Sequence, residues 1–224
     1  MQGASNILLE GNNLSRLFAG LGVSIQIALV SVLLSIPLGI LVGVFMTSRS
    51  RVVRFILRFY LDFIRIMPQL VLLYIVFFGT AAWFGVSFDG YTSSIVVFTL
   101  WGAAEMGDLV RGALESIPRM QYDSAYVLGF DRRQTFTCII LPQAVRRLLP
   151  PAVNLITRMV KTTSLCMLIG VVELIRVGAQ IIDLNRFAHP DGALWIYGAI
   201  FFMYFFVCFP LSLLSRYLEK RASK

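Results

Sequence analysis

Charged residues and histidine are scarce in this sequence of 224 residues. Only 14% of the residues are charged, and His189 is the one histidine. Hydrophobic residues make up 58% of the chain, and its mean hydropathy of +0.78 is well above that of an ordinary water-soluble domain. Inside a bilayer the backbone must satisfy its hydrogen bonds within helices or a closed barrel. The long uncharged runs lack the alternation of barrel strands, so we predict an all-α integral membrane protein.

Cysteines are few, and a nucleotide-binding loop is missing. Cys138, Cys166 and Cys208 have no Cys-x-x-Cys spacing and lie in or beside apolar segments, which favours small buried residues over a disulfide or a metal site. A phosphate-binding loop requires Gly-x-x-x-x-Gly-Lys-Ser/Thr, and the only Lys-Thr pair, Lys161-Thr162, lies inside an apolar segment. We therefore expect that this chain binds no metal and no cofactor and does not hydrolyse ATP itself.

Long apolar segments predict five transmembrane helices, at residues 17–48, 59–83, 91–110, 148–172 and 193–215. Lysine and arginine gather after the first segment, between the third and fourth, and in the tail that includes Lys224. Such short basic loops stay on the cytoplasmic side. The net charge of +8 thus serves orientation, with no nucleic acid as partner, and we expect the amino terminus outside and the carboxyl terminus in the cytoplasm. A polar outer loop is expected at 178–192.

Two features inside the predicted spans indicate close packing and bending. Ser35, Gly39 and Gly43 recur at every fourth position, which lets a neighbouring helix approach the backbone closely. This neighbour can belong to the same subunit or to a second copy. Pro68, followed by Gln69, predicts a bend in the second span, because proline removes a backbone hydrogen bond and clashes with the preceding turn. The bend can be a gate or a packing kink.

The connection of residues 117–151 is the one long cytoplasmic segment. Its middle predicts a short helix that ends at Gly129, since glycine readily takes the left-handed conformation after a helix. A second helix should begin at Asp131, which forms a plausible capping box with Gln134. Such an elbow suits a docking surface, although a solvated connector on the membrane surface would show the same pattern. Three prolines, which should stop or bend the chain before the fourth span, follow it: Pro142, Pro150 and Pro151.

The elbow resembles the EAA loop of ABC importer permeases, the coupling helix that seats in a groove of the ATPase subunit. The resemblance rests on Asp123-Ser124-Ala125, on Gly129 and on residues 139–144, although Asp123 and Ser124 replace the usual Glu and Ala. Further stretches are similar to signatures of the polar amino-acid branch of this family: residues 65–70, 108–114 and 161–165. Glu105 departs from the family, which often has an aromatic residue there.

This resemblance implies a permease subunit of an ATP-driven importer for polar amino acids, in the plasma (inner) membrane of a prokaryote. Its implied partners are two ATPase subunits that hold ATP and Mg, a second permease subunit of the same or a homologous chain, an extracytoplasmic amino-acid-binding protein and membrane lipid. Residues 1–224 would form one permease domain, with 117–151 as its coupling loop. The implied ATPase-coupling residues are Asp123, Ser124, Ala125, Gly129, Phe130 and Pro142.

Charged side chains lie inside the second, third and fourth predicted spans, where each costs about 2.5 to 3.5 kcal/mol near mid-membrane and therefore faces protein, water or a partner. Glu105 and Asp108 share one face of the third span, and Arg158 and Lys161 share one face of the fourth. The two faces can meet as an ion-pair network that fixes packing, or they can line the substrate path. In the second case Lys161 with neighbouring hydroxyls would bind a carboxylate and Glu105 an ammonium group. The substrate-path candidates are Glu105, Asp108, Arg158, Lys161, Thr162, Thr163, Ser164, Pro68 and Gln69.

Two other classes of protein remain open at this stage. An autonomous channel or secondary transporter needs no docking elbow and often has internal repeats, which this sequence lacks. A membrane-embedded enzyme would have to use His189 beside Asp191 as an acid–base pair.

Overall fold

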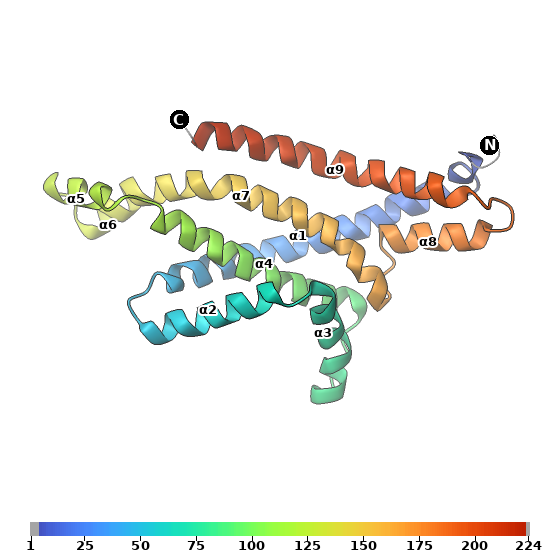
Figure 1. Cartoon of the computed structure of the whole chain (residues 1–224), viewed down its shortest axis with the longest axis horizontal. Helices are drawn as coiled ribbons and strands as arrows, with labels where there is room; N and C mark the ends of the chain where they lie inside the picture. The colour runs from blue at the N-terminus through green and yellow to red at the C-terminus, as the bar shows by residue number, and fades with distance from the viewer. Residues whose placement is uncertain (1–4, 223–224) are drawn as a thin grey trace. The chain divides into compact units, whose positions relative to one another are not determined.

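The chain is described by a computed structural model over residues 5–222, and every regular element in this range is helical (Figure 1). Four helical runs are long and apolar enough to cross a membrane, or five if one bent pair of helices counts as a span. This confirms the predicted all-helical membrane class. Lys224 of the basic tail lies outside the described residues. The four runs are α1 (Asn13–Met46), α4 (Gly90–Glu115), Arg132–Ile169 and α9 (Gly192–Ala222).

The remaining elements are shorter, and several belong to the third of these runs. Residues 132–169 comprise α6 (Arg132–Gln134), the π-helical η2 (Thr135–Ile140), α7 (Leu141–Thr162) and the 3-10 helix η3 (Thr163–Ile169). The bent pair consists of α2 (Arg51–Ile66) and α3 (Gln69–Phe84). The others are η1 (Ser5–Leu8), α5 (Arg119–Val127) and α8 (Leu174–Asn185).

Internal contacts divide the described chain into two compact units. The first unit contains the described residues up to 31, with 68–98 and 158–210, and the second unit contains 32–67, 99–157 and 211–222. The first unit has a core in which Leu17 of α1 packs with α8 and with Ile196 and Ile200 of α9. In the second unit a smaller core joins the end of α4 to η2 and the start of α7. Each proposed functional feature below lies within one of these units.

The second predicted span, 59–83, is bent at Pro68 as the sequence predicts, but the bend is a break between two helices. The backbone is extended at Met67 (φ −69°, ψ 136°) and at Pro68 (φ −59°, ψ 128°), so α2 ends and α3 begins as a separate helix. Proline disfavours the helical conformation of the residue before it, which explains why the break falls at Met67. The carbonyl of Pro68 then accepts hydrogen bonds from Val71 and Leu72 in the first turn of α3. Pro68 therefore ends a helix, where the sequence predicted a bend within one.

The predicted polar loop at 178–192 is also wrong in extent, because α8 occupies most of it. Glu173 caps this helix: its carboxylate accepts hydrogen bonds from the backbone N–H groups of Ile175 and Arg176. One face of α8 is buried at helical spacing and packs into the core of the first unit. With 12 residues it is too short to span a membrane, and only residues 186–191 connect it to α9. Its buried residues are Leu174, Val177, Gly178 and Ile181.

Prolines do not stop the chain before the fourth span. Pro142 is the second residue of α7, and Pro150 and Pro151 lie inside it, within a helical run that continues to Ile169. The backbone carbonyl of Pro150 accepts a hydrogen bond from the hydroxyl of Ser215 on α9, at 3.1 Å. This bond joins α7 to α9 within the second unit.

Small residues bring α1 and α4 into close contact within the second unit. A Cβ atom added at Gly43 would lie 2.6 Å from the carbonyl oxygen of Gly107, and one added at Gly39 would lie 2.5 Å from the Cβ of Met106. The hydroxyl of Ser35 donates to the carbonyl of Thr99 at 3.2 Å. All three residues of the small-residue stripe on α1 therefore contact α4 of the same chain. Of the two readings that the sequence left open, the structure shows packing within one subunit.

Substitution of Gly43 by alanine tests this contact. The added methyl group would meet a backbone oxygen, so we expect Gly43→Ala to destabilise the protein by about 1 to 3 kcal/mol. Gly22→Ala is the matched control on α1, because a Cβ atom there has no neighbour within 4 Å. Thermal unfolding of the purified protein in detergent measures the difference. Equal melting temperatures for the two variants would contradict the close approach.

Candidate functional site

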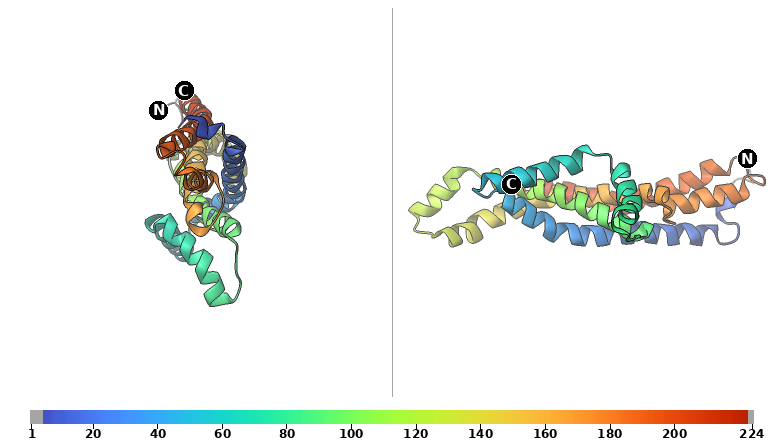
Figure 2. Two further views of the ribbon diagram at one scale, coloured as in Figure 1. Left: turned by 90° about the vertical axis from the view of Figure 1, so that its right-hand side faces the viewer. Right: turned by 90° about the horizontal axis from the view of Figure 1, so that it is seen from below.

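The elbow between α4 and α7 is the segment of short helices coloured yellow-green in Figure 2. A cap on each side of its corner stiffens it. Gly129 takes the left-handed conformation (φ +82°), the N–H of Phe130 bonds to the carbonyl of Ala125, and the N–H of Gly129 bonds to that of Tyr126. This is a Schellman motif, which satisfies the last carbonyls of α5. Asp131 and Gln134 form the predicted capping box, with reciprocal bonds of 2.8 and 3.0 Å. The predicted corner of two short helices is thus confirmed.

The elbow is anchored to α4 by apolar and polar contacts inside the second unit. Ala113 and Ile117, at the end of α4, pack against Ile140 and Ala144. The guanidinium of Arg147 donates to the carbonyl oxygen of Ser116 at 2.6 Å and to its hydroxyl at 2.8 Å. A displacement of the elbow therefore moves the end of α4, because both kinds of contact resist separation.

An exposed apolar cluster lies on the elbow at the end of α5. Tyr126, Val127 and Leu128 are 81%, 84% and 73% exposed at the end of α5. Exposed apolar clusters of this kind mark surfaces that bind a partner. The structure places five of the six coupling candidates on this elbow and the sixth, Pro142, at the start of α7. Ala125 is buried, Phe130 is half-buried, and Asp123, Ser124, Gly129 and Pro142 are exposed.

The acidic residues of α4 are held by arginines of the second unit. Arg65, near the end of α2, bonds to Glu105 at 3.0 Å and to Asp108 at 2.8 Å. Arg111 bonds to the second oxygen of Asp108 at 2.6 Å and to Glu115 at 2.6 Å. The Glu105 side chain is only 11% exposed, so its carboxylate depends on such a partner. The sequence analysis did not assign Arg65 to this cluster, although its place in an otherwise apolar stretch was a signal that it needs an acidic partner.

Lys161 and its neighbouring hydroxyls lie in the first unit and do not act as one group of donors. Each hydroxyl donates to a backbone carbonyl one turn earlier: Thr162 to Arg158, Thr163 to Val160 and Ser164 to Lys161, at 2.8 to 2.9 Å. These hydroxyls would have to rotate before they could donate to a carboxylate. Lys161 and Ser164 line a pocket of about 400 Å³, whose other walls are mostly apolar. The remaining lining residues are Ile175, Phe201, Tyr204, Phe205 and Cys208.

A buried carboxyl that sequence reasoning missed lies in the same unit. Glu173 is fully buried, and besides capping α8 its Oε2 lies 3.3 Å from the hydroxyl of Ser24 and 3.5 Å from that of Tyr204. Burial raises the pKa of Glu173 above its ordinary value, against the effect of the backbone hydrogen bonds. Its position before an apolar helical stretch was the available signal, since a negatively charged side chain is stabilising near the N-terminus of a helix. We assign Glu173 the role of a structural cap.

The features that suggested other chemistry are not assembled into a site. His189 pairs with Glu10 at 2.9 Å, and no bond joins it to Asp191 among the described residues. Residues 5–222 contain no group of three or more His, Cys, Asp or Glu residues placed to hold a metal ion. The three cysteines are free thiols; Cys166 and Cys208 are buried as predicted, whereas Cys138 is exposed.

Comparisons of the sequence with known proteins give consistent matches. Residues 35–224 match the family described as binding-protein-dependent transport system inner membrane component. The chain is 31% identical to the L-cystine transport system permease protein TcyB of Bacillus subtilis, over 93% of this chain and 87% of that protein. It is 31% identical to the probable glutamine ABC transporter permease protein GlnP of the same organism, over 93% and 94%.

Two solved structures have a similar fold. The crystal structure of an amino acid ABC transporter with histidines superposes with a TM-score of 0.82 at 22% identity, covering 92% of this chain and 94% of the other. The inward-facing MetNI methionine ABC transporter superposes with a TM-score of 0.71 at 16% identity, covering 94% and 98%. Both likenesses concern the fold alone.

The ion cluster on α4 predicts a coupled response to mutation. Arg65→Gln removes this partner from the nearly buried Glu105, and we expect the free energy of unfolding to fall by about 1 to 3 kcal/mol. The expected loss is smaller than for a fully buried ion pair because Arg65 is partly exposed. Adding Glu105→Gln should recover part of the loss, because it removes the nearly buried negative charge that Arg65 balanced. Denaturant or thermal unfolding in detergent measures both, with the exposed Arg133→Gln as control. Strictly additive losses in the double variant would show that the pair is uncoupled.

Proposed function

Because the chain belongs to the family of binding-protein-dependent transport system inner membrane components, we propose that it is the permease subunit of an ATP-driven importer for polar amino acids. The observation that carries this proposal is the family match over residues 35–224, together with relatives that are named as cystine and glutamine permeases. The chain is a multi-pass protein of the bacterial inner membrane. As a transport subunit of this family it is not an enzyme, and it works with a binding protein and an ATPase.

The finer architecture of the proposal follows from the charges and the candidate spans. We take the bent pair α2 and α3 as one span, which makes five. The amino terminus then lies outside, and the basic segments after α1, along the elbow and at the end of α9 all lie in the cytoplasm. Residues 1–224 form one permease domain with 117–151 as the coupling loop. Two ATPase subunits that hold ATP and Mg, a second permease subunit of the same or a homologous chain and an extracytoplasmic amino-acid-binding protein complete the transporter.

Coupling in this proposal runs from the elbow to the acids of α4. The exposed corner of Tyr126, Val127 and Leu128 seats in the ATPase, whose closure on ATP displaces it. The caps on both sides of Gly129 resist bending, so the displacement reaches α4 through the apolar contacts and through Arg147. α4 carries Glu105 and Asp108, so their environment changes with the state of the ATPase. The displacement that drives alternating access would thus be transmitted through contacts within the second unit.

The substrate contacts of the proposal need both signs of charge, because an amino acid is zwitterionic at neutral pH. Glu105 is the candidate for an ammonium or other cationic group, and its bonds to Arg65 would have to exchange for the substrate. Lys161 is the candidate for the carboxylate, and its pocket is supporting evidence. Arg158, Asp108 and the hydroxyls of residues 162–164 are secondary candidates. Pro68 and Gln69, at the break between α2 and α3, are candidates for a gate.

Two substitutions of Gly129 test the role of the elbow. At φ +82° valine is strained by about 1 to 3 kcal/mol, whereas asparagine tolerates this conformation. We expect Gly129→Val to lower ATP-dependent uptake by roughly tenfold and Gly129→Asn to keep it near the wild-type rate. Uptake into proteoliposomes that contain the ATPase and the loaded binding protein measures this. Gly112→Ala is the control, since its added methyl group has no neighbour within 4 Å. Undiminished uptake by correctly inserted Gly129→Val would contradict the coupling role.

Competition for uptake tests the assignment of Glu105. If its carboxylate contacts a cationic substrate group, Glu105→Gln should weaken competition by arginine about tenfold or more and leave competition by glutamine nearly unchanged. Glutamate serves as the third competitor, because an acidic substrate should gain from loss of the negative charge. Identical competition by all three amino acids before and after the substitution would assign Glu105 to packing alone.

A further inference from the structure

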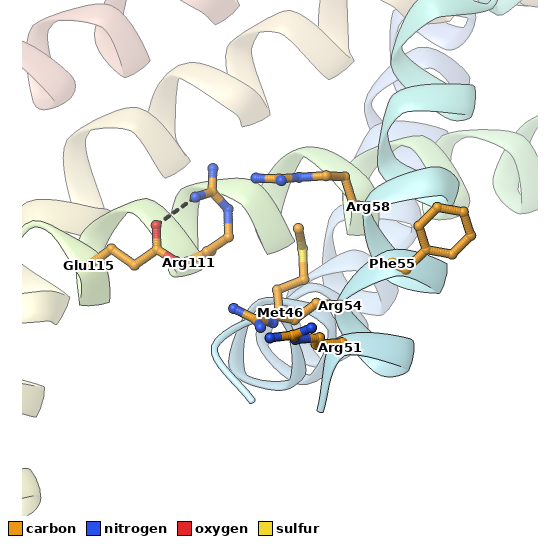
Figure 3. Close-up of a pocket in the computed structure, with 7 residues that line it drawn as sticks. All are labelled: Met46, Arg51, Arg54, Phe55, Arg58, Arg111 and Glu115. Atoms are coloured by element: carbon orange, nitrogen blue, oxygen red, sulfur yellow. Dashed lines mark hydrogen bonds and ion pairs between the residues drawn. The ribbon is translucent and has the colours of Figure 1, made fainter. Parts of the chain in front are cut away.

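A strongly cationic pocket lies in the second unit, at the basic start of α2 (Figure 3). Its volume is about 400 Å³, within the range of small-molecule sites. Figure 3 shows the guanidinium of Arg58 extending toward Arg111, while the ring of Phe55 is directed away from them. Four arginines and one glutamate contribute to the walls. The lining residues are Met46, Arg51, Arg54, Phe55, Arg58, Arg111 and Glu115.

Most of the positive charge of this pocket is not neutralised by the chain. Glu115 bonds to Arg111, which also holds Asp108, so the one acidic residue of the pocket is already engaged. Arg51, Arg54 and Arg58 make no ion pair with any residue of the described range 5–222. They are spaced three and four residues apart and therefore share one face of α2. Three guanidinium groups that line one pocket and pair with no carboxylate of the described range are suited to bind an anion from outside the chain.

An apolar row borders these arginines on the same helix. Val52, Phe55, Ile56 and Phe59 are all exposed, with Phe55 at 73%. In a protein of the inner membrane such a row faces acyl chains, because lipid tails cover exposed apolar side chains. A free phosphate or nucleotide would use the arginines and leave the row unused. A phospholipid uses both, because its charged headgroup and its acyl chains belong to one molecule and the two rows lie side by side on α2.

We propose that this pocket binds the phosphate-bearing headgroup of an anionic phospholipid, with its acyl chains along Val52, Ile56 and Phe59. The planar guanidinium groups of Arg51, Arg54 and Arg58 match phosphate oxygens by paired hydrogen bonds. The bound lipid joins the start of α2 to the end of α4, because Arg111 and Glu115 of α4 form the opposite wall. The far end of α2 is joined to α4 by Arg65. This inference rests on the family's membrane location and not on the substrate of the transporter.

Lipid binding is tested on the purified complex of this chain with its partner subunits. Native mass spectrometry in detergent counts bound phosphatidylglycerol during a titration, with phosphatidylcholine as the zwitterionic comparison. We expect the triple variant Arg51→Gln, Arg54→Gln, Arg58→Gln to bind phosphatidylglycerol about a hundredfold more weakly, at roughly 1 kcal/mol for each arginine lost. The matched control removes three positive charges from the end of α9, by Arg216→Gln, Lys220→Gln and Arg221→Gln. It should bind like the wild type.

Two further experiments, cross-linking and competition, locate the lipid and distinguish it from a soluble anion. A photoreactive phosphatidylglycerol should cross-link the wild-type complex at α2, which keeps the test valid if the triple variant folds poorly. Inorganic phosphate and a nucleoside triphosphate should compete only weakly, because they lack acyl chains. Equal loss of lipid in the triple variant and its control, or cross-links confined to other helices, would overturn the proposal. Tight competition by inorganic phosphate or the nucleotide would also overturn it and assign the pocket to a soluble anion.

Discussion

The position of α4 in the second unit depends on the close approach of its backbone to α1. Gly39, Gly43 and Gly107 leave no room for a Cβ atom, and the two helices touch through carbonyl oxygens and small side chains. Helices in a membrane gain little from hiding apolar surface, because lipid tails are equally apolar, so dense packing of this kind stabilises their association. Each functional feature of the second unit lies on α4 or contacts it. This helix carries the acidic pair, anchors the elbow and forms one wall of the arginine pocket.

Electrostatics then decides where α2 lies against α4. Glu105 is almost removed from solvent, and a carboxylate in this position is tolerated only with a partner. Arg65 supplies one by bonding to both Glu105 and Asp108, while Arg111 completes the coordination of Asp108. The same helix presents Arg51, Arg54 and Arg58 toward its other end, where they form no ion pair with any residue between 5 and 222. The positive charge of α2 is therefore balanced by acidic residues of α4 at one end, and at the other end it is available to an external anion.

The elbow shows how local and tertiary interactions share a mechanical task. Its stiffness is local, because the Schellman motif at Gly129 and the capping box of Asp131 and Gln134 satisfy backbone groups within a few residues of each other. Its connection to the rest of the unit is tertiary, through the apolar contacts of Ile140 and Ala144 and the hydrogen bonds of Arg147. A rigid lever and a firm attachment are both required if a push on the exposed corner is to move a helix.

The sequence by itself determined the helical membrane class, the main spans, the corner at Gly129 and the family. These features depend on hydropathy along single helices and on caps formed by residues close in the chain. They can therefore be predicted from local sequence patterns. Only the tertiary structure decided that Arg65 holds Glu105 and Asp108, that the stripe of Ser35, Gly39 and Gly43 meets α4, and that residues 174–185 form a packed helix in place of a loop. It also showed that the hydroxyls of residues 162–164 donate to their own backbone. The reason is that each of these outcomes depends on which groups compete for the same partner in space, and spacing along the chain does not encode that competition.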